Sequence, residues 1–176
     1  SASAGSGGTI SPSSRTVAHG ATTTFTVTPN TGYTTSVGGT CGGNLVGTTY
    51  TTNAVTASCT VVASFTVNDY TVSASAGANG SITPSSRTVA HGATTTFTVT
   101  PNTGYTASVG GTCGGNLVGN TYTTNAVTAD CTVVASFVID MSGTLTPATP
   151  SCIIALGASN CNINFSWTTT NPIATS

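Results

Sequence analysis

The residues of this 176-residue chain that could do chemistry are six cysteines, two histidines and three aspartates. The cysteines are spaced as three local pairs, which are Cys41 with Cys59, Cys113 with Cys131, and Cys152 with Cys161. The first two pairs each enclose 17 residues and the third encloses eight. An even number of cysteines with one pair per segment is typical of a secreted protein held by disulfides. We therefore expect three local disulfides, although the spacing alone leaves other pairings open.

Metal binding and acid–base catalysis have little support among the other reactive residues. A zinc site needs clustered ligands, but the chain has no Cys-x-x-Cys pair and one histidine per repeat, His19 and His91. Each lies before a glycine in a Val-Ala-His-Gly-Ala segment, which favours a surface turn residue over a ligand or base. Asp69, Asp130 and Asp140 are scattered at turns or module ends, so neither a calcium site nor a carboxylate pair is expected.

Several kinds of covalent and nucleotide chemistry need residues that the chain lacks. It contains no Gly-x-Ser-x-Gly nucleophile motif and no lysine for a phosphate-binding loop. Without lysine or glutamine, it cannot form Lys–Asn isopeptide bonds, Cys–Gln thioesters or Thr–Gln esters. We therefore expect no enzymatic activity, no catalytic residue, no bound metal and no cofactor.

The composition favours an extracellular protein. Charged residues make up 3% of the chain, whereas globular domains average about 25%. Threonine, at roughly a quarter of all residues, supplies most of the polar surface. A net charge of −1 gives no electrostatic reason to bind nucleic acid, and no apolar run approaches the ~20 residues of a membrane helix. We expect a secreted or cell-surface location, no nucleic-acid partner and no membrane insertion.

An internal repeat divides the chain. Residues 73–137 repeat residues 1–65 with a displacement of 72 positions and about nine in ten residues identical. The repeat predicts two tandem modules, 1–69 and 70–140, followed by a different segment, 141–176. Modules this small bury little apolar surface, so each disulfide is expected to stabilise by about 2–3 kcal/mol. The first copy lacks the counterparts of Tyr70–Val72, and we expect Ser1 to be a processed end or a cut within a longer protein.

Short runs of Thr, Val, Ile, Phe and Tyr between Gly, Pro and Asn predict an all-β fold. In residues 21–28, Phe25 and Val27 alternate with threonines, as in a half-buried strand. Residues 38–43 are too rich in glycine for regular structure. Further strands are predicted at Tyr33–Val37, Leu45–Thr51, 54–57, Cys59–Val67 and Tyr70–Ala76, with a return strand starting at residues 81–84.

The order of motifs in both copies resembles a known family. Each copy contains Thr-Val-Ala-His-Gly-Ala-Thr-Thr-Thr-Phe-Thr-Val-Thr-Pro-Asn-Thr-Gly-Tyr, then Cys-Gly-Gly-Asn-Leu-Val-Gly, and finally Cys-Thr-Val-Val-Ala-Ser-Phe. This pattern resembles the divergent InlB B-repeat family, whose modules occur in tandem in bacterial secreted and surface proteins. The resemblance implies a small, β-grasp-related module that acts as a spacer or adhesin stalk and brings no catalytic residues.

The last segment has a different pattern. Four apolar residues, Cys161, Ile163, Phe165 and Trp167, alternate with polar residues and predict a strand with one core face. With a short strand at Ser142–Ala148, the segment resembles the start of a bacterial immunoglobulin-like β-sandwich. Such a sandwich needs about seven strands, so we expect the missing strands to come from a longer chain or from another molecule. These four residues are the candidate assembly strand.

Two functions from different classes are consistent with these features. The first is a structural stalk or filament subunit, joined to copies of itself or to neighbouring domains by strand complementation. The second is an adhesin that binds glycan or host protein through the loops Gly42–Tyr50 and Gly114–Tyr122. Arg15 and Arg87 are expected to pair with an aspartate or lie over an aromatic ring.

Overall fold

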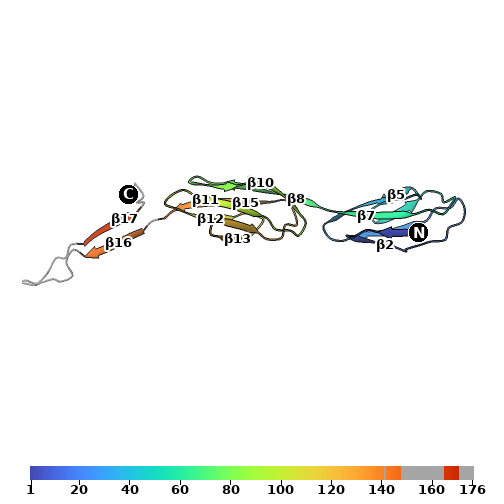
Figure 1. Ribbon diagram of the computed structural model, residues 1–176, viewed down its shortest axis with the longest axis horizontal. Coiled ribbons are helices and arrows are strands. Elements are labelled where there is room, and N and C mark those ends of the chain that lie inside the picture. The colour runs from blue at the N-terminus through green and yellow to red at the C-terminus, as the bar shows by residue number, and fades with distance from the viewer. Residues whose placement is uncertain (141, 148–164, 171–176) are drawn as a thin grey trace, which may run out of the picture.

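The computed structural model describes residues 1–140, 142–147 and 165–170. These residues form short strands and turns without a helix, which confirms the predicted all-β fold. They therefore include no helix that could span a membrane. Figure 1 shows the two repeats as separate β modules that follow one another along the long axis of the molecule.

Module 1 consists of two facing sheets. Its strands are β1 (Ala2–Ala4), β2 (Gly8–Ser11), β3 (Thr24–Pro29), β4 (Tyr33–Gly38), β5 (Gly43–Val46), β6 (Thr49–Thr52) and β7 (Val61–Val67). One sheet has the order β1-β7-β4 and the other has the order β2-β3-β6-β5. The first and last strands, β1 and β7, run parallel, and the other pairs are antiparallel.

Module 2 repeats this arrangement and adds one strand. Its strands are β8 (Asp69–Ala76), β9 (Gly80–Thr83), β10 (Ser86–Ala90), β11 (Thr96–Pro101), β12 (Tyr105–Gly110), β13 (Gly115–Val118), β14 (Thr121–Thr124) and β15 (Cys131–Ile139). The sheets have the orders β10-β8-β15-β12 and β13-β14-β11-β9. The additional strand is β10, which pairs antiparallel with the first half of β8.

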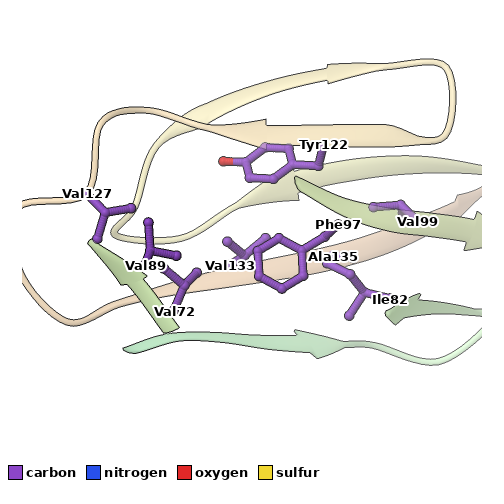
Figure 2. Close-up of a cluster of buried hydrophobic side chains, with 9 residues drawn as sticks. All are labelled: Val72, Ile82, Val89, Phe97, Val99, Tyr122, Val127, Val133 and Ala135. Carbon is purple, nitrogen blue, oxygen red and sulfur yellow. The ribbon is translucent and has the colours of Figure 1, made fainter. Parts of the chain in front are cut away.

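Side chains from both sheets meet in the core of each module. Figure 2 shows the core of module 2, formed by Val72, Ile82, Val89, Phe97, Val99, Tyr122, Val127, Val133 and Ala135. The core of module 1 contains Phe25, Val27, Tyr50, Val61 and Ala63. The threonines between core residues point outward, as period-2 alternation in a strand requires. Threonine thus covers the outer faces while a few Val, Phe and Tyr residues fill the interior.

Three local predictions were wrong. Leu45–Thr51 is not one strand, because Gly47 with φ of 58° reverses the chain and separates β5 from β6. Residues 81–84 do not return along β8, because β9 joins the opposite sheet and pairs with β11. Residues 54–57 form no strand.

The third segment is described only over two strands. β16 (Ser142–Pro147) and β17 (Phe165–Thr170) form an antiparallel two-stranded sheet, in which Leu145 is opposite Trp167 and Pro147 is opposite Phe165. The predicted strand at 142–148 corresponds to β16. Cys152, Cys161 and Ile163 lie outside the described residues.

Candidate assembly surfaces

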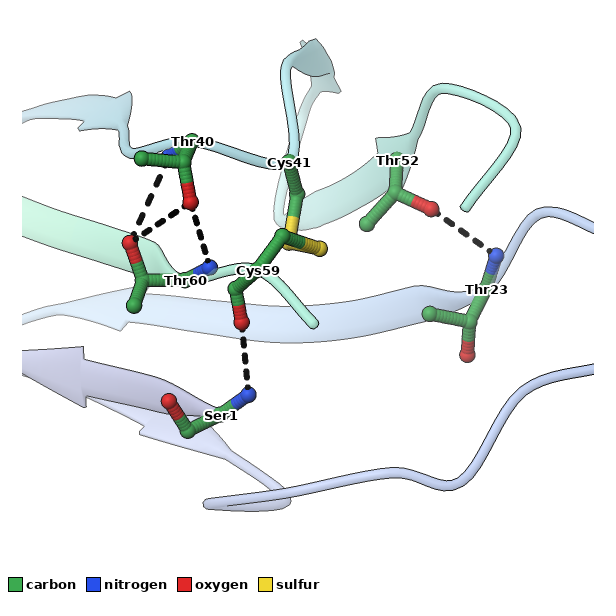
Figure 3. The surroundings of a disulfide bond; sticks show 7 residues. All are labelled: Ser1, Thr23, Thr40, Cys41, Thr52, Cys59 and Thr60. Atoms are coloured by element: carbon green, nitrogen blue, oxygen red, sulfur yellow. Dashed lines mark hydrogen bonds between the residues drawn. A yellow bond between two sulfur atoms is a disulfide. The ribbon is translucent and has the colours of Figure 1, made fainter. Parts of the chain in front are cut away.

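A disulfide fastens the end of one sheet in each module. In module 1, Cys41 is bonded to Cys59, with 4.9 Å between their Cα atoms (Figure 3). Beside it, Thr60 N donates to Thr40 Oγ1 at 2.9 Å, and Thr40 N donates to Thr60 Oγ1 at 3.3 Å. The bond joins the segment after β4 to the segment before β7. It therefore fixes the β4–β5 loop against the β6–β7 loop.

Module 2 has the same arrangement. Cys113 is bonded to Cys131, and Thr132 N donates to Thr112 Oγ1 at 2.9 Å. One substitution between the copies changes the surroundings: Ser58 of module 1 is replaced by Asp130. The Asp130 carboxylate accepts a hydrogen bond from Thr71 N at 2.8 Å and so holds the start of β8.

The two modules are joined through Asn68, the single residue between β7 and β8. Asn68 N donates to Gly32 O at 2.8 Å, and its carbonyl oxygen accepts from His91 N at 2.8 Å. The Asn68 side-chain oxygen accepts from Thr34 Oγ1 at 2.5 Å. One linker residue therefore bonds to module 1 on one side and to module 2 on the other, and we call this set of contacts the module joint.

His91 is part of the module joint and not a plain surface turn residue, which corrects the sequence prediction for this copy. Its ring is half-buried and lies 5.9 Å from the Tyr70 ring, centroid to centroid, at a tilted angle. Its Nδ1 is buried without a hydrogen-bond partner in the part of the chain that the structure describes. His19, at the same place in module 1, is exposed. The two histidines have identical local sequences, so their different burial results from their positions in the array.

Arg87 has a structural role different from the expected one. Its Nε donates to the backbone carbonyl of Thr96 at 3.1 Å, and not to an aspartate or an aromatic face. This contact joins β10 to the start of β11 across an exposed surface. Arg15, its counterpart, lines a cleft in module 1.

That cleft has a volume of about 540 Å³ and opens beside the start of β1. Its lining includes Arg15, Thr16, Val17 and His19 on one segment, residues 55–59 on another, and Phe25. The Ser1 ammonium lies at one end and donates to Cys59 O at 3.0 Å (Figure 3). We call this cleft the module 1 groove.

The two modules share their sheet arrangement apart from β10, and they have the same disulfide, which agrees with the comparison with known families. The family model of the divergent InlB B-repeat domain matches residues 1–69 and again residues 70–141. The chain belongs to the divergent InlB B-repeat family. No curated protein and no solved structure matched the chain. The B-repeat match ends at residue 141, so it lends no support to an immunoglobulin-like third segment.

The B-repeat loops proposed for glycan binding are two hairpins. Gly42–Tyr50 includes β5 and the turn to β6, and Gly114–Tyr122 includes β13 and the turn to β14. Tyr50 and Tyr122 are each 2% exposed, so neither ring is available to stack on a sugar. The exposed apolar residues of these hairpins are Val46 and Val118.

The structure divides the predicted site residues between distinct places. The four described cysteines lie at the module ends, whereas Phe165 and Trp167 of the candidate assembly strand lie in β17. No group of three His, Cys, Asp or Glu side chains is arranged to hold a metal ion in the described ranges. Sequence reasoning missed the module joint. The sequence did contain a sign of it. The predicted strands Cys59–Val67 and Tyr70–Ala76 almost follow one another, so the linker between the modules had to be very short.

Proposed function

We propose that this B-repeat chain is a non-catalytic, extracellular structural element of a bacterial surface protein, a stalk or filament subunit. The module joint carries this proposal. Because β7 continues into β8 through Asn68 alone, and because Asn68 bonds to both modules, the joint leaves little freedom for bending. A rod built from such joints keeps whatever it carries at a fixed distance from the cell. The disulfides support an oxidising, extracellular location.

Filament assembly is the finer part of the proposal. Among the described residues, β16 and β17 pair only with each other, so their outer edges have backbone groups that can accept another strand. A two-stranded sheet is marginally stable alone. Strand complementation by a second copy along β17, which contains Phe165 and Trp167, would complete it.

Light scattering after size exclusion and negative-stain electron microscopy of the full chain test assembly. We expect filaments with one chain per axial step. Trp167→Asp should abolish them, and Thr168→Asp, at the next position of the same strand, should not. A monodisperse wild-type monomer would refute the filament and leave the stalk.

An adhesin role is the second candidate, and one observation favours it. Val46 and Val118 are 71% and 70% exposed at equivalent hairpin tips, so the array presents the same apolar group twice. Two equal sites on one rod would bind a host protein with avidity. Glycan-array and cell-binding assays of the wild type beside Val46→Ser/Val118→Ser test this role. Retained binding in the double variant would exclude the hairpin tips.

A further inference from the structure

The chain enters and leaves module 2 through two neighbouring strands that run in the same direction. It enters through β8 and leaves through β15, and these strands pair parallel over residues 72–76 of β8 and 131–135 of β15. β8 begins before the paired stretch, at Asp69, and β15 continues beyond it, to Ile139. The entry point and the exit point therefore lie at opposite ends of one ladder of backbone hydrogen bonds.

A pull along the array loads this ladder lengthwise. Asn68 alone joins β7 to β8, and the two modules follow one another along the long axis of the molecule (Figure 1). Tension would draw β8 toward module 1 and β15 away from it, so the two strands would have to slide past each other. The bonds of a parallel pair are evenly spaced, so they share the load of a slide, whereas a peeling motion breaks them one after another.

The loaded strands lie inside their sheet and carry core residues. In the order β10-β8-β15-β12, both β8 and β15 have a neighbouring strand on each side. The inward side chains of these two strands include Val72, Val133 and Ala135, which have no exposed surface. A slide of one strand along the other would therefore also draw apolar side chains out of the core, which is costly in water.

Hydrogen bonds outside the paired stretch extend the contact at both ends. At the entry end, Thr71 N donates to Oδ1 of Asp130, the residue before β15, at 2.8 Å. At the other end, Gly77 N donates to Ala135 O at 2.9 Å. Module 1 pairs β1 with β7 in the same parallel register. The parallel pairing of the first and last strands is thus common to both modules.

We propose that these modules bear tension, and that the parallel pair of first and last strands is the clamp that resists it. This rests on the proposed stalk function and adds that the stalk resists pulling as well as setting a distance. The disulfide of module 2 has a separate part, because it joins the segment after β12 to Cys131 and does not cross from β8 to β15. Once the clamp has yielded, the disulfide still closes the loop of residues 114–130 and so limits the extension.

Single-molecule force spectroscopy of the full chain in two pulling directions tests the clamp. In the first, handles at the two ends of the chain load both modules through their first and last strands. In the second, the C-terminal handle is moved to p-azidophenylalanine in place of the exposed Thr94. Ala90 lies opposite Asp69 at the entry end of module 2, so this pull peels β10 from β8 and does not slide β8 along β15. Module 1 is loaded alike in both experiments and is the internal reference.

The end-to-end pull should break module 2 at a force at least about twofold higher than the peeling pull at the same loading rate, because forced unfolding depends on the unfolding barrier. Equal forces in the two directions would overturn the clamp. They would leave the stalk proposal intact, because a spacer needs a stiff joint and no resistance to pulling.

Removing the disulfide tests its part in the proposal. The variant Cys113→Ser/Cys131→Ser should lengthen the extension of module 2 by about 60 Å, because the bond spans a sequence separation of 18 and a stretched chain covers about 3.3–3.6 Å per residue. The end-to-end rupture force should not change, since a disulfide acts mainly by constraining the unfolded chain. An unchanged extension would overturn the limiting role of the disulfide, and a lower rupture force would overturn a clamp made by β8 and β15 alone.

Discussion

The imidazole of His91 lies directly against the backbone of Gly32, across the boundary between the modules. A Cβ atom built on Gly32 would come within 2.1 Å of His91 Cδ2 and 2.2 Å of its Cγ. Gly32 also has a φ of 80°, which disfavours side chains. The histidine of module 2 therefore packs against the turn between β3 and β4 of module 1.

Gly32→Ala should lower the stability of the chain by more than the unfavourable φ alone would. Gly20→Ala is the matched control, because Gly20 has a φ of 82° and open space where a Cβ would lie. Both variants should lose about 1 kcal/mol from the unfavourable φ. Gly32→Ala should lose at least about 1 kcal/mol more from the clash. Urea unfolding of the full chain measures the difference, and equal losses would contradict the contact.

His91→Ala should loosen the module joint. The substitution removes the ring that lies between Gly32 and Tyr70, while the bond from the residue 91 amide to Asn68 can remain. NMR ¹⁵N relaxation should then show the two modules tumbling with different correlation times, whereas we expect the wild type to tumble as one elongated body. His19→Ala is the control, since His19 is exposed in the same local sequence. Unchanged joint tumbling in His91→Ala would show that the Asn68 bonds are sufficient.

The alternation of Phe25 and Val27 with threonine was enough to predict the strand and its buried face, because period-2 patterning is a local property. Spacing likewise favoured the pairs Cys41–Cys59 and Cys113–Cys131, which are present, whereas the third expected pair lies outside the described residues. In contrast, the different structures of residues 14–18 and Ser86–Ala90 could not be predicted from two identical sequences. A strand forms where a partner is present, and here the partner is the start of β8. Whether such a segment forms a strand is decided by its pairing partner and not by its strand propensity.

Thr124→Val should destabilise module 2 through one unpaired amide. Thr124 is 3% exposed, and its Oγ1 accepts a hydrogen bond from Thr95 N at 3.0 Å. Valine fills the same space but cannot accept the bond, so the loss should be about 1–3 kcal/mol. Thr124→Ser keeps the hydroxyl and should retain the bond while losing a methyl group. Chemical denaturation compares the two, and a smaller loss for valine than for serine would refute the assignment.

Removing one disulfide should affect one module. The double variant Cys113→Ser/Cys131→Ser opens a loop with a sequence separation of 18 and should lower the stability of module 2 by about 3 kcal/mol. Module 1 keeps the Cys41–Cys59 bond and should be unaffected apart from the module joint. Calorimetry should therefore resolve two unfolding transitions, one for each module. We expect their midpoint temperatures to lie further apart in the variant than in the wild type. A uniform shift of both would mean that the modules unfold as one unit.

Alkaline pH should weaken module 2 through Tyr122. Burial raises the pKa of the Tyr122 phenol above its ordinary value of 10.0, because the interior disfavours the phenolate. Below that value the phenol is protonated in both states, so its contribution to stability is complete. Above it the unfolded chain releases the proton first and binds fewer protons than the folded chain, so stability falls as pH rises, with a limiting slope of about 1.4 kcal/mol per pH unit. Tyr122→Phe should remove this part of the alkaline loss, as urea titrations from about pH 8 to about pH 11 would show. If the wild type and Tyr122→Phe lost stability in parallel over that range, the phenol of Tyr122 would be free to ionise in the folded protein.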